Sequence, residues 1–140
     1  MLAEVRERCD AIEECYEFML AYAAQGLPSD EGSRSDGQIR AFLRRAVKAL
    51  AGLAESCARA VKHEGLEPAE RYAAFFRVVD RDAGDSLAAM ELVLAQPAIS
   101  SQLIDNLNAS IHLRAILTDL FLVSEILSAQ TLPKPIVTSI

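Results

Sequence analysis

The stretch from Leu103 to Leu127 constrains the fold of this chain more than any other part of the sequence. Its second half is apolar on nearly every side, with only a few polar residues between leucine, isoleucine, valine and phenylalanine. A surface helix has one apolar face, whereas a helix that is apolar all round has to be covered on most sides. The stretch therefore predicts either the central helix of a bundle or a helix that lies in an oligomer interface.

The rest of the composition favours helices in a single globular domain. The chain has 140 residues, of which 51% are hydrophobic and 24% are charged. This length suffices to bury a core without disulfides or metal ions, and the balance of residues argues against disorder. Alanine and leucine are abundant and β-branched residues are few, which is typical of helical proteins.

Apolar residues recur at alternating spacings of three and four, and glycine and proline interrupt this pattern at a few points. We therefore predict an all-α fold, an elongated antiparallel four-helix bundle with an extended C-terminal tail. The predicted single domain covers 1–130, with helices at about 2–25, 36–64, 68–95 and 97–130, a mobile loop at 26–37 and the tail at 131–140. Asp36 is the expected N-cap of the second helix, and Pro68 and Pro97 are expected in the first turns of the third and fourth.

Charge and cysteine content restrict the classes of partner and the compartment. The formal net charge is −6, so we expect no nucleic-acid partner, which would need a basic surface. Arg114, Asp119 and Glu125 interrupt the longest apolar stretch, and the first residues lack the pattern of a secretory signal, so we expect no membrane insertion. Three cysteines without framework spacing favour reduced thiols and a cytoplasmic location.

The apolar side chains of the fourth predicted helix and of the tail exceed what a simple surface helix needs. No catalytic motif accompanies them, so we expect a protein that acts through protein–protein contacts, as a small adaptor, chaperone or regulator. Its expected partners are a second copy of itself, in a homodimer, and one unidentified protein. The predicted interaction surface consists of Leu113, Ile116, Leu120, Phe121, Val123, Leu127, Ile136 and Val137.

The alternative is a ligand-binding or enzymatic helical bundle with a pocket between helices. Its candidate lining is the set in which aromatic and titratable side chains can converge, namely Tyr72, Phe75, Phe76, His112 and Asp119. We predict no catalytic, cofactor-binding or metal-binding residues, because no nucleophile with a base is visible and the Glu-x-x-His pattern of di-iron bundles is missing from the sequence. We favour a non-enzymatic role and leave the enzymatic one open.

A third hypothesis concerns Cys9 and Cys57. If the first two predicted helices are antiparallel, these residues lie at the same level and face the same core. They then form either a thiol pair that responds to oxidants or holds a soft metal, or two small buried hydrophobic residues. The last interpretation is the more common for free cysteine.

Overall fold

The computed structural model describes residues 1–32 and 37–131, and every regular element within these ranges is an α-helix. This confirms the all-α prediction. The C-terminal tail predicted at 131–140 lies outside the described residues except for its first position. The helices are α1 (Leu2–Ala24), α2 (Gln38–Ala51), α3 (Leu53–Glu64), α4 (Ala69–Leu94), α5 (Ser101–Ala109) and α6 (Ile111–Thr131).

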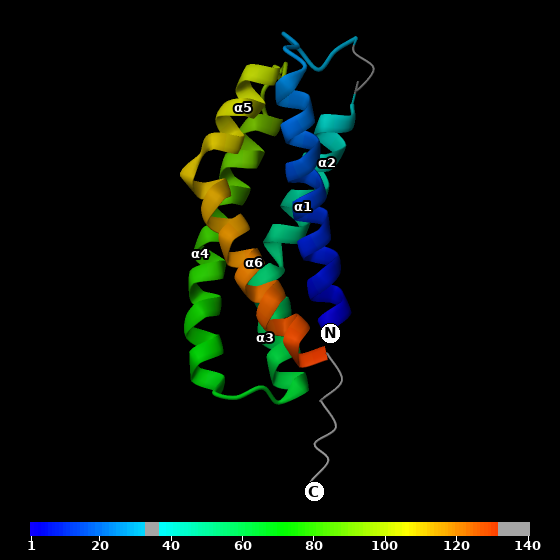
Figure 1. Ribbon diagram of the computed structural model, residues 1–140. Coiled ribbons are helices and arrows are strands. Elements are labelled where there is room, and N and C mark those ends of the chain that lie inside the picture. The colour runs from blue at the N-terminus through cyan, green and yellow to red at the C-terminus, as the bar shows by residue number, and fades with distance from the viewer. Residues whose placement is uncertain (33–36, 132–140) are drawn as a thin grey trace, which may run out of the picture.

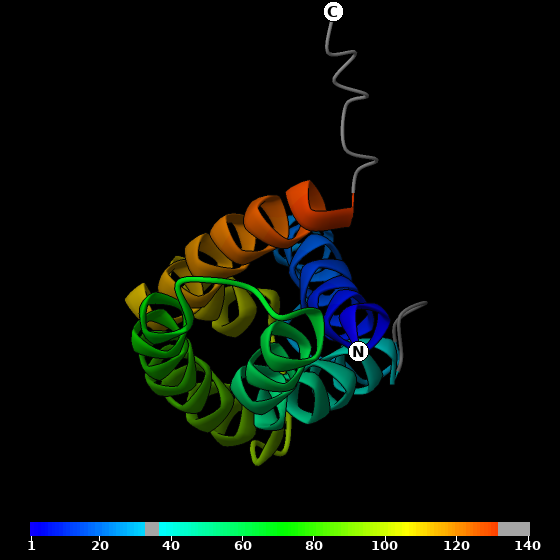
Figure 2. The same ribbon diagram turned by 90° about the horizontal axis from the view of Figure 1, so that it is seen from below.

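The helices run side by side along one long axis (Figures 1 and 2). Both α1 and α4 pack against α2, α3, α5 and α6, but within the described ranges they do not pack against each other. They therefore lie on diagonally opposite sides of the core, separated by the pair α2 and α3 on one side and the pair α5 and α6 on the other.

The core is formed by one face of each helix. The buried residues of α1 are spaced by three and four and include Cys9, Ile12 and Met19. Tyr22 ends this row fully buried, and its hydroxyl donates a 2.6 Å hydrogen bond to the Ile99 carbonyl. The aromatic ring therefore adds apolar burial while its polar group keeps a partner.

The second predicted helix, 36–64, is in fact two helices that meet at Gly52. Arg8 of α1 lies at this break, where its guanidinium donates 3.1 Å hydrogen bonds to the carbonyls of Lys48 and Ala49 at the end of α2. A Cβ at position 52 would lie 2.7 Å from Arg8 Nη2, so only glycine leaves room for this contact. The side chain of one helix thus satisfies terminal carbonyls of another.

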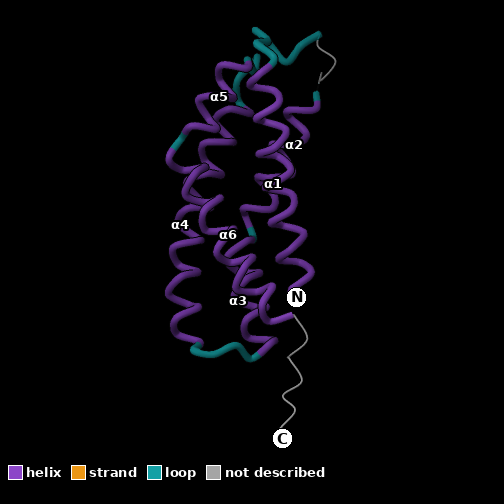
Figure 3. The backbone as a smooth tube through the Cα atoms, in the orientation of Figure 1, coloured by secondary structure: helices purple, strands orange, loops and turns teal. Residues whose placement is uncertain are grey.

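The fourth predicted helix, 97–130, is also divided, at Ser110. It begins at Ser101 instead of Pro97, because the Ser100 hydroxyl accepts a 3.0 Å hydrogen bond from the Leu103 amide and acts as the N-cap. Ser110 has extended backbone angles, and its hydroxyl accepts a bond from the Leu113 amide at 3.3 Å. Figure 3 shows these breaks as short loop segments between helices.

The remaining boundaries differ in detail. Pro68 has extended backbone angles and is the N-cap of α4, so the helix begins one residue later than predicted. Gly84 lies within α4 and does not interrupt it. Asp36, the expected cap of the second helix, lies outside the described residues, and Gly37 occupies the N-cap position of α2.

Part of the loop predicted at 26–37 is attached firmly to the core. Asp30 is only 3% exposed and accepts hydrogen bonds from Arg40 Nε at 2.7 Å and from the Ile99 amide at 2.8 Å. Arg40 also donates to the carbonyls of Leu94 and Gln96 at the end of α4. This buried ion pair joins the first loop, α2 and the loop that follows α4.

Candidate binding surface

The predicted interaction surface on α6 requires a correction. Five of its eight residues pack within the chain, each no more than 6% exposed, because they form the face of α6 that points into the core. They are Leu113, Ile116, Leu120, Val123 and Leu127. Of the remaining three, Phe121 is 59% exposed, while Ile136 and Val137 lie outside the described residues.

The opposite face of α6 nevertheless carries large apolar side chains that remain exposed in the described structure. Ile111 is 75% exposed, Leu122 49% and Ile126 36%, and Phe121 lies beside them. Isolated apolar residues on a surface are ordinary, but four on one face of a single helix indicate a contact surface. We call Ile111, Phe121, Leu122 and Ile126 the α6 apolar face.

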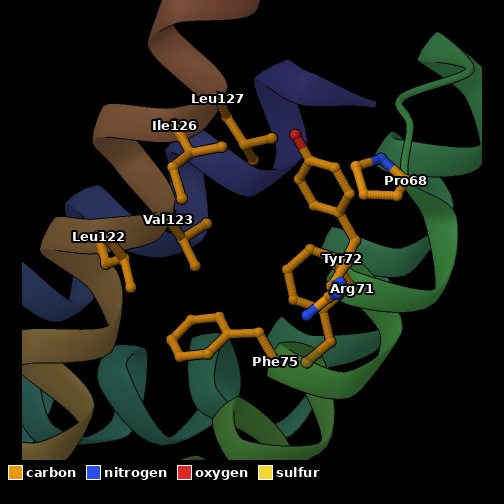
Figure 4. A pocket seen from close by; sticks show the side chains of 9 residues that line it. Pro68, Arg71, Tyr72, Phe75, Leu122, Val123, Ile126 and Leu127 are labelled. Atoms are coloured by element: carbon orange, nitrogen blue, oxygen red, sulfur yellow. The ribbon is translucent and has the colours of Figure 1, made fainter.

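A pocket of about 240 Å³ lies between α4 and α6 next to this face. It is lined mainly by aromatic and aliphatic side chains, namely Pro68, Arg71, Tyr72, Phe75, Phe76, Leu122, Val123, Ile126 and Leu127. In Figure 4, Tyr72 and Phe75 extend from α4 toward α6, and Val123 and Leu127 extend from α6 toward α4. We call this the α4–α6 pocket.

The spacing of the lining residues explains how the pocket forms. Tyr72, Phe75 and Phe76 are separated by three and four positions, so they share one face of α4. Leu122 and Ile126 are four positions apart on α6, and both also belong to the α6 apolar face. Pocket and exposed face are therefore continuous.

Of the five residues predicted for a pocket, the structure brings together Tyr72, Phe75 and Phe76 and leaves the other two outside the lining. His112 is exposed, and it contacts α4 through its backbone carbonyl, which accepts a 2.9 Å hydrogen bond from the Ser86 hydroxyl. Asp119 is buried beside Asp82 of α4, one helical turn before Val123. The pocket thus lacks the predicted titratable groups, and Arg71 is its one charged lining residue.

Asp119 is the most perturbed acid of the described chain. Burial, together with the hydrogen bond and negative charge of Asp82, raises the pKa of the Asp119 carboxyl to about 7. Its Oδ2 has no hydrogen-bond partner among the described residues. An acid of this kind holds a proton near neutral pH, and the group beside it is a second carboxylate, Asp82. Both lie outside the pocket lining, so we assign this pair no specific reaction.

The cysteines are poor candidates for a reactive pair. Cys9 and Cys57 are buried and free, and burial raises the pKa of their thiols to about 11 and about 12. The reactive species is the thiolate, and these raised pKa values favour the protonated thiol of both residues at neutral pH. Cys15, the third cysteine, is also buried, and its pKa is raised to about 12 for the same reason.

Within residues 1–32 and 37–131, no group of three or more histidine, cysteine, aspartate or glutamate side chains is placed to hold a metal ion. No helix in these ranges is both long enough and apolar enough to cross a membrane.

Comparisons with protein-family models, with curated proteins and with solved structures find no match for this chain.

Sequence reasoning missed Ile111, Leu122 and Ile126 as surface residues. The sequence contains a signal for them, because these three positions share one helical face, which differs from the face that carries Leu113, Ile116 and Leu120. Since both rows are apolar, periodicity cannot tell which row faces the core. That choice depends on where α4 and α1 lie, which only the folded structure shows.

Proposed function

We propose that this protein acts through protein–protein contacts and uses the α6 apolar face and the α4–α6 pocket as its binding surface. In this proposal α2 with α3, and α5 with α6, are two broken members of an elongated antiparallel four-helix bundle. The observation that carries the proposal is the continuity of an open apolar pocket with uncovered apolar side chains on the neighbouring helix.

Physical chemistry supports this proposal in two ways. Aromatic residues contribute strongly to protein interfaces because they bury much apolar area at low entropic cost, and Tyr72 and Phe75 line the pocket without being fully buried. The pocket also lies between two helices, a geometry that accepts apolar side chains spaced by three or four positions on a partner helix. The partner that fits best is a protein segment forming an amphipathic helix.

The proposal includes self-association and a cytoplasmic role as adaptor, chaperone or regulator. Self-association is supported by Ile111 and Phe121, which lie outside the pocket lining and remain uncovered if a partner helix enters the pocket. A reducing compartment is supported by three free cysteines.

A second candidate function is the binding of a small apolar ligand. It is favoured by the three aromatic residues that line the pocket, Tyr72, Phe75 and Phe76. The cavity of about 240 Å³ is smaller than the roughly 300–1,000 Å³ typical of sites for drug-sized ligands. Because His112 and Asp119 lie outside the lining, the observation favours simple binding over an enzymatic reaction.

The test is site-specific photo-crosslinking in cells that contain the protein's natural partners. Phe75 is replaced by a photoreactive phenylalanine derivative, and the matched control carries it at Arg44, an exposed residue of α2. We expect Phe75 to give a crosslink to a different protein and Arg44 to give none. Equal crosslinking at both positions, or none at Phe75, would contradict the proposal, and native mass spectrometry showing a bound small molecule would favour the second candidate.

A further inference from the structure

The outward side of α6 carries a row of small and apolar residues in which four positions form two symmetrical pairs. Ile111, Ala115, Thr118, Leu122 and Ile126 follow one another at spacings of four, three, four and four, so they form one row along the helix. Ala115 is half-buried and the other four are exposed. We propose that this row is the contact surface for a second copy of the chain, with the two α6 helices packed antiparallel. The inference deepens the proposed function by specifying the surface and register of self-association.

The spacing is self-complementary in the antiparallel orientation. We place the twofold axis perpendicular to the two helices, at the level midway between positions 118 and 119. Ile111 then lies opposite Ile126 of the second copy, and Ala115 lies opposite Leu122 of the second copy. Near the centre, the large side chain of Leu122 therefore packs against the small side chain of Ala115 of the second copy. At both ends, the contact joins two isoleucines. A twofold interface requires such matching, because each contact is made twice by the same surface.

The charges beside the row match in the same register. Arg114 and Glu125 lie on the same side of the row as Phe121 and are exposed. The twofold axis brings Glu125 to the level of His112 of the second copy and within one helical turn of Arg114 of the second copy. A parallel pair in register would instead place the two charged flanks on opposite sides of the interface, where Arg114 and Glu125 could not pair between copies, so charge favours the antiparallel orientation.

Burial of the centre of the row in the proposed interface does not leave a polar group without a hydrogen-bond partner. Thr118 is the one polar residue of the row, and its hydroxyl already donates a 2.9 Å hydrogen bond to the Arg114 carbonyl of its own helix. Burial of this side chain therefore leaves no unsatisfied donor. Phe121 of each copy lies next to the axis and adds an aromatic contact on the side of the charged pairs.

Cysteine cross-linking in the full-length chain tests the register. Ile111→Cys and Ile126→Cys are made singly, and a thiol reagent of short reach is added to each variant and to their mixture. Positions 111 of the two copies are about 22 Å apart along the axis, as are positions 126, whereas 111 and 126 are adjacent. We expect cross-linked dimer only in the mixture, while the buried native cysteines stay unmodified. Cross-linking of either variant alone, or none in the mixture, would overturn the register.

A charge exchange tests the orientation without altering the core. We expect Arg114→Glu and Glu125→Arg each to weaken dimerisation about tenfold, because each places two like-charge pairs across the axis. The double variant restores opposite charges and should recover most of the wild-type dimerisation constant. Failure of the double variant to recover, with circular dichroism showing an intact helical fold, would overturn the proposal.

These outcomes are separable from those of the proposed function. Leu122 and Ile126 of the row also line the α4–α6 pocket, but Phe75, the crosslinking position in α4, lies outside the row. A monomeric chain that still crosslinks a different protein through Phe75 would overturn the antiparallel dimer and leave the partner-binding surface in place. A dimer with the expected register and no crosslink to a different protein would do the reverse.

Discussion

Individual side chains determine how the connecting loops attach to the core. Asp30 illustrates this, because burial alone would raise the pKa of its carboxyl, yet hydrogen bonds from Arg40 and from the Ile99 amide outweigh burial and lower it. The sequence around Asp30 is typical of a solvated loop. Its attachment depends on Arg40, ten residues away, and on the Ile99 amide in the loop between α4 and α5, so no local pattern predicts it.

We predict that Asp30→Ala destabilises the fold by about 3 kcal/mol. The substitution leaves the Arg40 guanidinium, whose side chain is 18% exposed, without its carboxylate, and it removes the acceptor of the Ile99 amide. Urea denaturation followed by circular dichroism measures the loss. Glu31→Ala, at the exposed neighbouring position, is the matched control, and an equal effect in both variants would contradict the assigned role of Asp30.

Asp119 leads to a prediction about pH. Its pKa of about 7 is raised above the ordinary value of 3.8, so the folded state binds the proton more tightly than the unfolded state. The stability it contributes is complete below about pH 4 and is lost as the pH rises through 7. We expect Asp119→Asn, which stays neutral, to be more stable than wild type at pH 8 by on the order of 2 kcal/mol, and to lose this advantage at low pH. Parallel pH–stability curves for the two proteins would show that Asp119 does not titrate as described.

At the scale of elements, the periodicity of apolar residues predicted where helices occur but not where they are interrupted. The break at Gly52 shows why, since glycine is tolerated inside α4 at position 84 yet ends α2 at position 52. The difference is the guanidinium of Arg8, which occupies the space beside Gly52 and binds carbonyls of α2. Helix breaks that depend on a side chain from a distant helix leave no local signature.

A double-mutant cycle tests this explanation of the break. Gly52→Ala should destabilise wild type by about 1 kcal/mol, because the new methyl group displaces Arg8 and removes its hydrogen bonds. In an Arg8→Ala background the same substitution should stabilise by up to about 1 kcal/mol, because alanine favours helix over glycine. Chemical denaturation of the four proteins gives both values. An effect of the same sign and size in both backgrounds would show that Arg8 is not the cause.

At the scale of the whole molecule, the sequence predicted the all-α class and three aromatic residues of the pocket, but it did not predict which side of α6 remains uncovered. The stretch from Leu103 to Leu127 is apolar on two sides, and only the arrangement of α1 and α4 buries the row of Leu113 and leaves the row of Ile111 exposed. The sequence shows that this stretch has an excess of apolar residues, but it does not show which of them remain exposed on the contact surface. Their exposure is the basis of the proposed interaction.

Sedimentation equilibrium of the full-length chain at micromolar concentrations tests this central claim most directly. We predict that the mass of the wild-type protein rises with concentration toward twice the 15.2 kDa of one chain. Ile111→Glu, at the most exposed apolar position of the row, should lower this mass toward that of a single chain without loss of helicity. A mass of 15.2 kDa for wild type throughout this range would contradict the claim that the outward side of α6 is an interface between copies of the protein.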